Sequence, residues 1–339
     1  MNYKLKSVNK DFLVREVFCE QELLEKENAQ YTILWLKKQN INTFDAVKAI
    51  ADILEIDTQE ISYCGLKDED AIAKQQIAVR KILSDDDIKR INLHRDIFAT
   101  IMGYSDVPLR IGGLHGNVFS ITLRNIDVSY MEQLSKLHNC KIKVQSINYY
   151  DDQRFGVPNA KYNTHIIGKH IFDGCWDKAF AEYILSGNSN EEKEKMITYR
   201  KNHSAQECFF HCLDNRKISF FLNSYMSELW NKQVSKMVSQ KATGCALYEQ
   251  KIMRLNFIDK NAALVFENNY LPYEYYVVSG EADIVKKSKD RQIVIYTDVM
   301  VREVQKDELF PNKLKLCLDF FLPSGSYATM LVKQLFYVL

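Results

Sequence analysis

Apolar and polar residues repeat with two different periods along the first part of the chain. Residues 31–36 are apolar on both faces, as in a strand buried between two layers. Residues 41–56 repeat apolar side chains at helical spacing, and either Asn42 or Thr43 can cap the start of this helix. Residues 118–124 alternate strictly between apolar and polar, as in a half-exposed strand. We therefore expect an amphipathic helix packed on a sheet.

An acidic loop is expected between two further strands. Residues 61–64 have the pattern of a short strand, Gly65 permits a sharp turn, and residues 76–80 resume an extended pattern. The cluster KDED at 67–70 is therefore expected at the edge of the sheet. The glycines of segment 111–117 permit a tight approach to another main chain or to a phosphate, but a plain turn is favoured, because no helix follows that would support nucleotide binding.

The second part of the chain has a different texture. Residues 216–237 carry an apolar stripe at helical spacing, to which Leu229 belongs, whereas the chain from residue 273 onward has a β-like pattern. Residues 314–336 then return to a strand followed by a helix. We interpret this change as a separate mixed α/β lobe inserted into the first domain.

Composition narrows the class of protein. A chain of 339 residues exceeds the size at which a single core stays efficient, so we expect two domains or one domain with a large insertion. Hydrophobic residues make up 46% and charged residues 26%, and 12 glycines with 5 prolines leave little room for linkers. The formal net charge of +1 means that a nucleic-acid partner would need a locally basic cleft.

Nothing in the sequence indicates export or a membrane span. The N-terminal residues are charged, and no uninterrupted run of about 18 apolar residues occurs, so we expect a cytoplasmic protein that does not associate with a membrane. The eight cysteines include no Cys-x-x-Cys pair, which argues against a disulfide framework and against a zinc ribbon.

A zinc site remains one candidate. Cys208, His211 and Cys212 are spaced so that they share one face of a helix, and His203 is close in sequence. The alternative is an ordinary packed helix, because two phenylalanines lie among these residues and no second ligand pair has suitable spacing.

Two other segments carry candidate chemistry. NYYDDQRFG at 148–156 offers stacking rings, hydrogen-bonding amides and an arginine for a phosphate, although an aromatic-rich turn is more often plain packing. The cluster at 67–70 is, by pattern alone, most often a solvated corner. Within it Asp68 is favoured as a reactive carboxylate over Glu69, because it follows the strand end and Gly65 most closely.

Seven motifs in order make the chain resemble the TruD family of pseudouridine synthases over most of its length. They are DFLVRE (11–16), a tyrosine-led strand followed by INTFDAVKAIADIL (41–54), YCGLKDEDAIAKQ (63–75), GGLHGNVFSITLR (112–124), NYYDDQRFG (148–156), SYMSELWN (224–231) and LPSGSYAT (322–329).

The resemblance implies an α+β pseudouridine synthase fold with a central mixed, largely antiparallel sheet flanked by helices. It implies a catalytic domain at 1–156 together with 304–339, and an inserted TRUD domain at 157–303 that forms the other wall of an RNA cleft. Members convert a uridine of tRNA, typically at position 13, into pseudouridine: the N1 glycosidic bond breaks, the uracil turns over, and it is rejoined through C5. We therefore expect an isomerase that acts on tRNA as a monomer, without a metal or any other cofactor.

The family motif Gly-x-Lys-Asp-x-x-Ala gives the catalytic role to Asp68. Lys6 is the expected cationic partner of Asp68, with Lys67 as the alternative, and Tyr150 stands where the family usually has a stacking phenylalanine. The residues leave open whether the carboxylate attacks C6, attacks C1′ or removes the 2′ proton. The expected substrate-binding residues are Lys6, Phe12, Lys67, Asn148, Tyr150 and Arg154.

Several positions depart from the family pattern, and none of them removes the proposed nucleophile. They are Asn9-Lys10 for Pro-Glu, Ala73 for threonine, Asp151 for glycine and Lys333-Gln334 for Arg-Glu.

Two other classes of protein stay open. One is a non-catalytic RNA-binding protein on the same fold, against which the presence of Asp68 counts. The other is a zinc hydrolase built around the cysteine pair, which bound metal would reveal.

Overall fold

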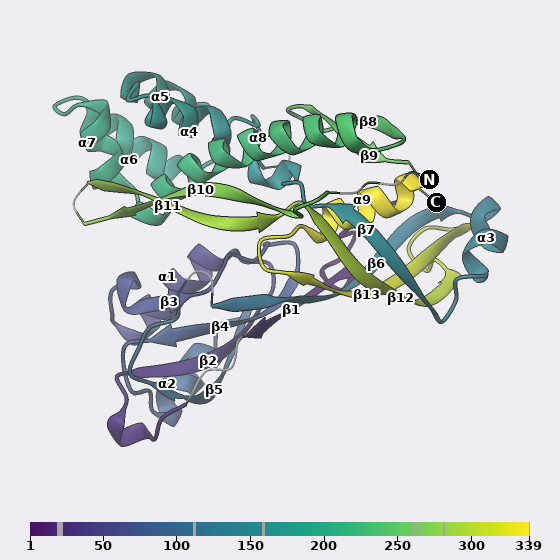
Figure 1. The fold of residues 1–339 in the computed structure, drawn as a ribbon. Coiled ribbons are helices and arrows are strands. Elements are labelled where there is room, and N and C mark those ends of the chain that lie inside the picture. The colour runs from purple at the N-terminus through teal and green to yellow at the C-terminus, as the bar shows by residue number, and fades with distance from the viewer. Residues whose placement is uncertain are drawn as a thin grey trace. The chain divides into compact units, whose positions relative to one another are not determined.

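The computed structural model describes residues 1–18, 23–110, 113–157, 160–259, 262, 264, 266–280 and 282–338. The chain packs into two compact units (Figure 1). Unit 1 consists of Met1–Val144 and Tyr296–Ser326, and unit 2 consists of Gln145–Ile295 and Tyr327–Leu339. These bounds differ from those of the expected domains, because residues 145–156 and 327–339 belong to unit 2 and residues 296–303 belong to unit 1. The catalytic and RNA-facing roles expected for the two domains stay predictions.

Unit 1 is built on a mixed sheet. Its strands are β1 (Phe12–Phe18), β2 (Tyr31–Lys38), β3 (Ile61–Tyr63), β4 (Ile72–Val79), β5 (Ile97–Ser105), β6 (Leu114–Asp127), β7 (Cys140–Ile147), β12 (Val294–Lys306) and β13 (Lys313–Pro323), the ends of β7 and β12 reaching into unit 2. Their order is β5-β2-β4-β1-β6-β13-β12-β7, with β3 paired to β4. β1 and β4 run parallel, whereas β2, β3, β6, β12 and β13 pair in antiparallel fashion. The predicted α+β class with a largely antiparallel sheet is confirmed.

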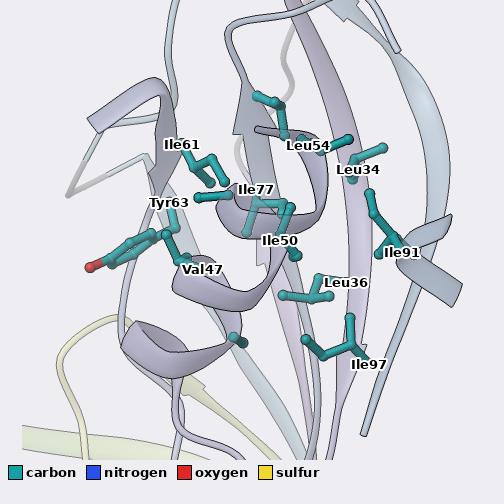
Figure 2. Close-up of a cluster of buried hydrophobic side chains, with 14 of the residues drawn as sticks. Leu34, Leu36, Val47, Ile50, Leu54, Ile61, Tyr63, Ile77, Ile91 and Ile97 are labelled. Carbon is teal, nitrogen blue, oxygen red and sulfur yellow. The ribbon is translucent and has the colours of Figure 1, made fainter. Parts of the chain in front are cut away.

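Helix α1 (Thr43–Leu54) places its apolar stripe on this sheet (Figure 2). Val47, Ile50 and Leu54 are buried in one cluster with Leu36 of β2 and Ile77 of β4. Full burial of such a side chain contributes about 1.5–3 kcal/mol. The cluster therefore fixes α1 and the strands on either side of the loop that precedes β4.

The start of α1 is capped by Asn42, one of the two predicted candidates. Its side chain accepts a hydrogen bond from the main-chain N of Asp45 at 2.9 Å. Thr43 is instead the first helical residue, and its hydroxyl accepts a hydrogen bond from the main-chain N of Lys67 at 2.9 Å. The start of the helix is thereby joined to the acidic loop.

The other helices of unit 1 are α2 (Asp85–Asn92) and α3 (Met131–Ser135), with short 3-10 turns at Asn9–Asp11, Lys26–Asn28, Thr58–Glu60 and Val128–Tyr130.

Unit 2 is centred on the long helix α8 (Asn215–Lys241), which matches the helix predicted at 216–237. Leu229, expected on its apolar stripe, is exposed, and Trp230 is buried instead. The ribbon of β10 and β11 packs along α8 (Figure 1). The other elements of the unit are a 3-10 turn at Asp152–Arg154, α4 (Thr164–Phe172), α5 (Trp176–Ile184), α6 (Asn190–Arg200), α7 (Ala205–Cys212), β8 (Cys245–Glu249), β9 (Arg254–Ile258), β10 (Tyr270–Ser279), β11 (Asp283–Gln292) and α9 (Ala328–Val338).

The predicted turn at 111–117 is wrong over its second half, since residues 114–117 belong to β6; residues 111 and 112 lie outside the described residues. A glycine is needed at position 116 of this strand, because a Cβ there would clash with the main-chain O of Leu322 on β13. Among the described residues, no helix is long and apolar enough to cross a membrane.

Candidate active site

Asp68 lies on the loop between β3 and β4, where the sequence predicted it. Its side chain is 34% exposed, and its Oδ2 accepts a hydrogen bond from Lys6 Nζ at 2.7 Å. A charge-assisted bond of this length is among the stronger hydrogen bonds in proteins. The structure thus brings Asp68 together with the lysine that was expected to be its cationic partner.

The N-terminal segment that carries Lys6 is tied to the sheet by Arg124 of β6. The Arg124 guanidinium donates to both carboxylate oxygens of Asp11, at 2.8 and 2.9 Å, and to Asp307 at 2.9 Å. The main chains of Lys4 and Arg124 exchange hydrogen bonds of 2.8 and 3.0 Å. All three side chains of the ionic network are buried, so the network positions the segment on which Lys6 lies.

Phe12, at the start of β1, supports Lys6. The Lys6 ammonium lies 4.7 Å from the centroid of the buried Phe12 ring, a cation–π contact. Phe119 packs edge-on against the same ring, with centroids 6.0 Å apart. Phe12 therefore orients Lys6, and its expected contact with the substrate stays a prediction.

Lys67 pairs with Glu16 of β1 rather than with Asp68. The Lys67 ammonium donates to one carboxylate oxygen of Glu16, both side chains being buried, and the other oxygen accepts a hydrogen bond from the main-chain N of Gln76 at 2.9 Å. Burial raises the pKa of Glu16, although the charge of Lys67 works in the opposite direction. Lys67 braces the loop against β1, and this burial counts against the substrate contact predicted for it.

Lys38 is a part of the site that the sequence analysis missed. Its side chain at the end of β2 is 1% exposed, and its Nζ donates to the main-chain O of Asp68 and to that of Ile41, each at 2.7 Å. Burial lowers the pKa of Lys38 to about 8, while the negative charge of Asp68 opposes the shift. In the sequence Lys38 is indistinguishable from the exposed Lys37, because the apolar run before them shows no alternation that would assign faces.

Asn148 begins the corresponding group in unit 2. Its side-chain Nδ2 donates to the main-chain O of Gln292 at 2.9 Å, and its Oδ1 accepts a hydrogen bond from Arg291 at 3.0 Å. The indole of Trp230 donates to the main-chain O of Asn148 at 2.9 Å. Both ends of the amide are engaged, so its orientation is fixed within unit 2.

Tyr150 is enclosed, with 7% of its surface exposed. The Arg291 guanidinium carbon lies 4.1 Å from the ring centroid, and the rings of Tyr273 and Tyr327 lie at 5.9 and 5.6 Å. The side-chain amide of Asn231 bonds both the main-chain N and the main-chain O of Tyr150 at 2.8 Å. A base stacks on this ring only if one of the neighbouring side chains moves aside. Arg291 lies within the β-like part of the chain predicted from residue 273 onward, but it was not among the predicted site residues, because nothing in the local sequence marks a buried arginine.

Arg154 packs beside Tyr150. Its guanidinium carbon lies 4.5 Å from the centroid of Phe220 and 5.8 Å from that of Tyr150, and its Nε donates to Ser227 Oγ at 3.1 Å. The side chain is half-buried. It adds positive charge beside the rings, and its expected phosphate contact stays a prediction.

Two departures from the family pattern meet in the structure. Lys333 of α9 forms an ion pair with the buried carboxylate of Asp151 and lies 3.3 Å from a carboxylate oxygen of Asp152. Burial alone would lower the pKa of Lys333, but the charge and the hydrogen bond of Asp151, together with the charge of Asp152, outweigh burial and raise the pKa. Asp151, which stands where the family has a glycine, is thus neutralised by Lys333, which stands where the family has an arginine.

The structure places the zinc candidates in an apolar core. Cys208 and Cys212 of α7 are buried among apolar side chains, and this burial raises the pKa of both thiols. His211 stacks on Tyr199 with ring centroids 4.2 Å apart, and His203 stacks on the same tyrosine at 3.9 Å. Within the part of the chain that the structure describes, no group of three or more His, Cys, Asp or Glu side chains is arranged to hold a metal ion. The packed-helix interpretation accounts for this segment.

The fold and the lysine-bound aspartate are those expected of a pseudouridine synthase. The family model described as tRNA pseudouridine synthase D (TruD) matches residues 1–215, and the chain belongs to this family. It is similar to a probable tRNA pseudouridine synthase D 1 of Methanococcus maripaludis, with 28% identity over 99% of this chain and 100% of the relative. A tRNA pseudouridine synthase D of Aquifex aeolicus is 26% identical over 99% of this chain and 98% of the relative.

A solved structure supports the same fold. The crystal structure of a putative tRNA pseudouridine synthase D from Methanosarcina mazei matches with a TM-score of 0.56 at 20% identity. The match covers 99% of this chain and 93% of that one.

Proposed function

We propose that this chain is a tRNA pseudouridine synthase, an isomerase that converts a uridine of tRNA, at position 13, into pseudouridine with Asp68 as its catalytic carboxylate. The observation that carries the proposal is the 2.7 Å bond between Lys6 and the one-third exposed carboxylate of Asp68, in a chain of the TruD family. The carboxylate is held by a cation and is still open to a substrate.

The reaction suits this arrangement. The N1 glycosidic bond of the uridine breaks, the uracil turns over, and a bond forms from C1′ to C5, so substrate and product contain the same atoms. The reaction needs a carboxylate close to the nucleoside, and the Lys6 ammonium holds that of Asp68 in place through a charge-assisted hydrogen bond. Lys38 fixes the main chain at the same residue, so that the carboxylate keeps its direction.

The target base has to leave the RNA stack to reach a carboxylate at the protein surface. Tyr150 is our candidate for the ring that receives it, and stacking on an aromatic side chain is worth about 1–3 kcal/mol per base. Arg291 packs on that ring and also donates hydrogen bonds to Asn148, so it has to move aside before a base stacks there. Asn148 and Arg154 lie on the same loop and are the candidates for a base edge and a phosphate.

Asp68→Asn tests the proposal. The amide has nearly the same size but carries no charge, so we expect no pseudouridine in a tRNA transcript, while binding of the transcript is largely kept. Asp70→Asn is the matched control, since this acid is exposed on the same loop and should retain full activity. Pseudouridine formation by Asp68→Asn at a rate comparable to the wild type would overturn the assignment.

Mapping pseudouridines in host RNA with and without this chain tests the target. Loss of pseudouridine at position 13 of tRNA is the expected result, and an unchanged map would favour the non-catalytic RNA-binding alternative. A cytoplasmic location and a monomeric state stay predictions of the sequence.

A further inference from the structure

The ribbon of β10 and β11 sorts its side chains by face. Tyr273 stands opposite Lys289, and Tyr275 stands opposite Lys287, in the antiparallel register. Alternate residues of a strand share a face, so Lys287, Lys289 and Arg291 form one column beside the two tyrosines. From 285 to 291 this face of β11 carries no acidic residue. We call these three residues the cationic column.

The opposite face of the ribbon is neutralised. There Lys286 forms an ion pair with Glu274 across the ribbon, and Asp290 adds a negative charge. Among the residues that the structure describes, no carboxylate lies within ion-pair distance of Lys287 or Lys289. The positive charge of the ribbon is therefore concentrated on one of its two faces.

The cationic column starts at the Asn148–Tyr150 group and runs outward. Arg291 is buried against Tyr150 and donates to Asn148, whereas Lys289 and Lys287 are exposed. Lys289 Nζ lies 5.6 Å from the centroid of Tyr275, so ring faces accompany the charges.

Lys289 lies close to other positive charges. Partial desolvation lowers its pKa, and the positive charges of Arg291 and Arg154 lower it further, although Tyr150 acts in the opposite direction. An anion beside these groups relieves this repulsion and is therefore bound favourably.

We propose that the cationic column binds phosphates of the substrate RNA next to the nucleotide received at Tyr150. The proposal rests on the proposed function and names a surface that guides the substrate. Alternate residues of a strand are about 6.6–6.8 Å apart, a separation comparable to that of successive phosphates in an extended RNA strand. Such contacts set the register of the RNA on the protein without reading its sequence.

The double variant Lys287→Gln/Lys289→Gln tests this surface with a tRNA transcript as the probe. We expect the slope of log affinity against log salt to become shallower by about 1.4–1.8, because each phosphate contact contributes about 0.7–0.9. Binding at low salt should weaken about tenfold. The loss should also appear as a raised KM for pseudouridine formation. Lys287→Arg/Lys289→Arg keeps both charges and should retain wild-type affinity.

Lys286→Gln is the control, because it removes one positive charge from the opposite face of the same strand. An unchanged affinity and salt slope in the double variant would overturn the proposal, and so would an equal loss in Lys286→Gln. The two proposals can fail separately. If the wild-type chain binds the transcript but forms no pseudouridine, the proposed enzyme activity is refuted, and the affinities of the ribbon variants still test the phosphate contacts.

Discussion

The two groups of candidate residues are held by different forces. In unit 1 the open carboxylate of Asp68 is held by charge, with Lys6 on its side chain and Lys38 on its main-chain O. In unit 2 the main chain of the enclosed Tyr150 is held by the neutral amides of Asn231 and Gln250, and its ring is held by packing against Tyr273, Tyr327 and Arg291. A carboxylate that meets a substrate has to stay exposed, so its support comes from long cationic side chains. A ring is fixed by packing and by neutral hydrogen bonds, which pH and salt change little.

The largest expected effect comes from removing a buried charge behind the loop of unit 1. Lys67→Met leaves the buried carboxylate of Glu16 without its cation, which should lower the free energy of unfolding by about 3–5 kcal/mol. The loss should be smaller at pH 5 than at pH 8, because the pKa of Glu16 is raised and the folded variant takes up a proton there. Urea unfolding at the two pH values measures both effects.

A second substitution separates the charge from the packing. Glu16→Gln combined with Lys67→Met removes both charges, so the double variant should be more stable than Lys67→Met alone. Lys81→Met is the control, because the ion pair of Lys81 with Asp87 is partly exposed and should contribute no more than about 1 kcal/mol. A double variant that is less stable than Lys67→Met would show that packing dominates at this position.

The next effect concerns the ring of unit 2. Tyr150→Ala removes the stacking face, so we expect the rate of pseudouridine formation to fall about 10–100-fold, in line with about 1–3 kcal/mol for one stacked base. Tyr150→Phe keeps the ring and should stay near the wild-type rate. Single-turnover kinetics on a tRNA transcript measure both variants. Equal rates for the alanine and phenylalanine variants would remove Tyr150 from the site.

Local patterns predicted much of the fold. The helices α1 and α8 follow from periodicity, and β2 follows from a run that is apolar on both faces, because these faces pack against neighbours in the same unit. The error at 114–117 has a different cause. The glycines indicated a close approach to another main chain, but the local pattern did not reveal that this neighbour is β13, with which Gly116 pairs in the sheet.

The site was less predictable than the fold. Lys6 and Asp68 are 62 positions apart, and only the resemblance to a family placed them together. Lys38 and Arg291 are buried cations on strands, and their faces depend on the register of each strand with its partners. Lysine and arginine mostly lie at protein surfaces, so nothing in the neighbouring sequence indicates that one of them is buried.

The smallest expected effect is also the sharpest test of the charged support in unit 1. The pKa of Lys38 is about 8 in the folded chain and about 10.4 for an exposed lysine, so between these values unfolding takes up a proton. The free energy of unfolding of the wild type should therefore rise relative to that of Lys38→Met between pH 8 and pH 10, by on the order of 1 kcal/mol per pH unit.

Over the same range the rate of pseudouridine formation should fall in the wild type, because a neutral amine makes weaker hydrogen bonds to the main-chain O of Asp68 and of Ile41. Lys38→Met should be slow and should lack this alkaline decline, whereas Lys37→Met, altered at the exposed neighbour, should follow the wild type in both measurements. If the rate of pseudouridine formation changed with pH in the same way in the wild type and in Lys38→Met, the activity of Asp68 would not depend on the charge of Lys38.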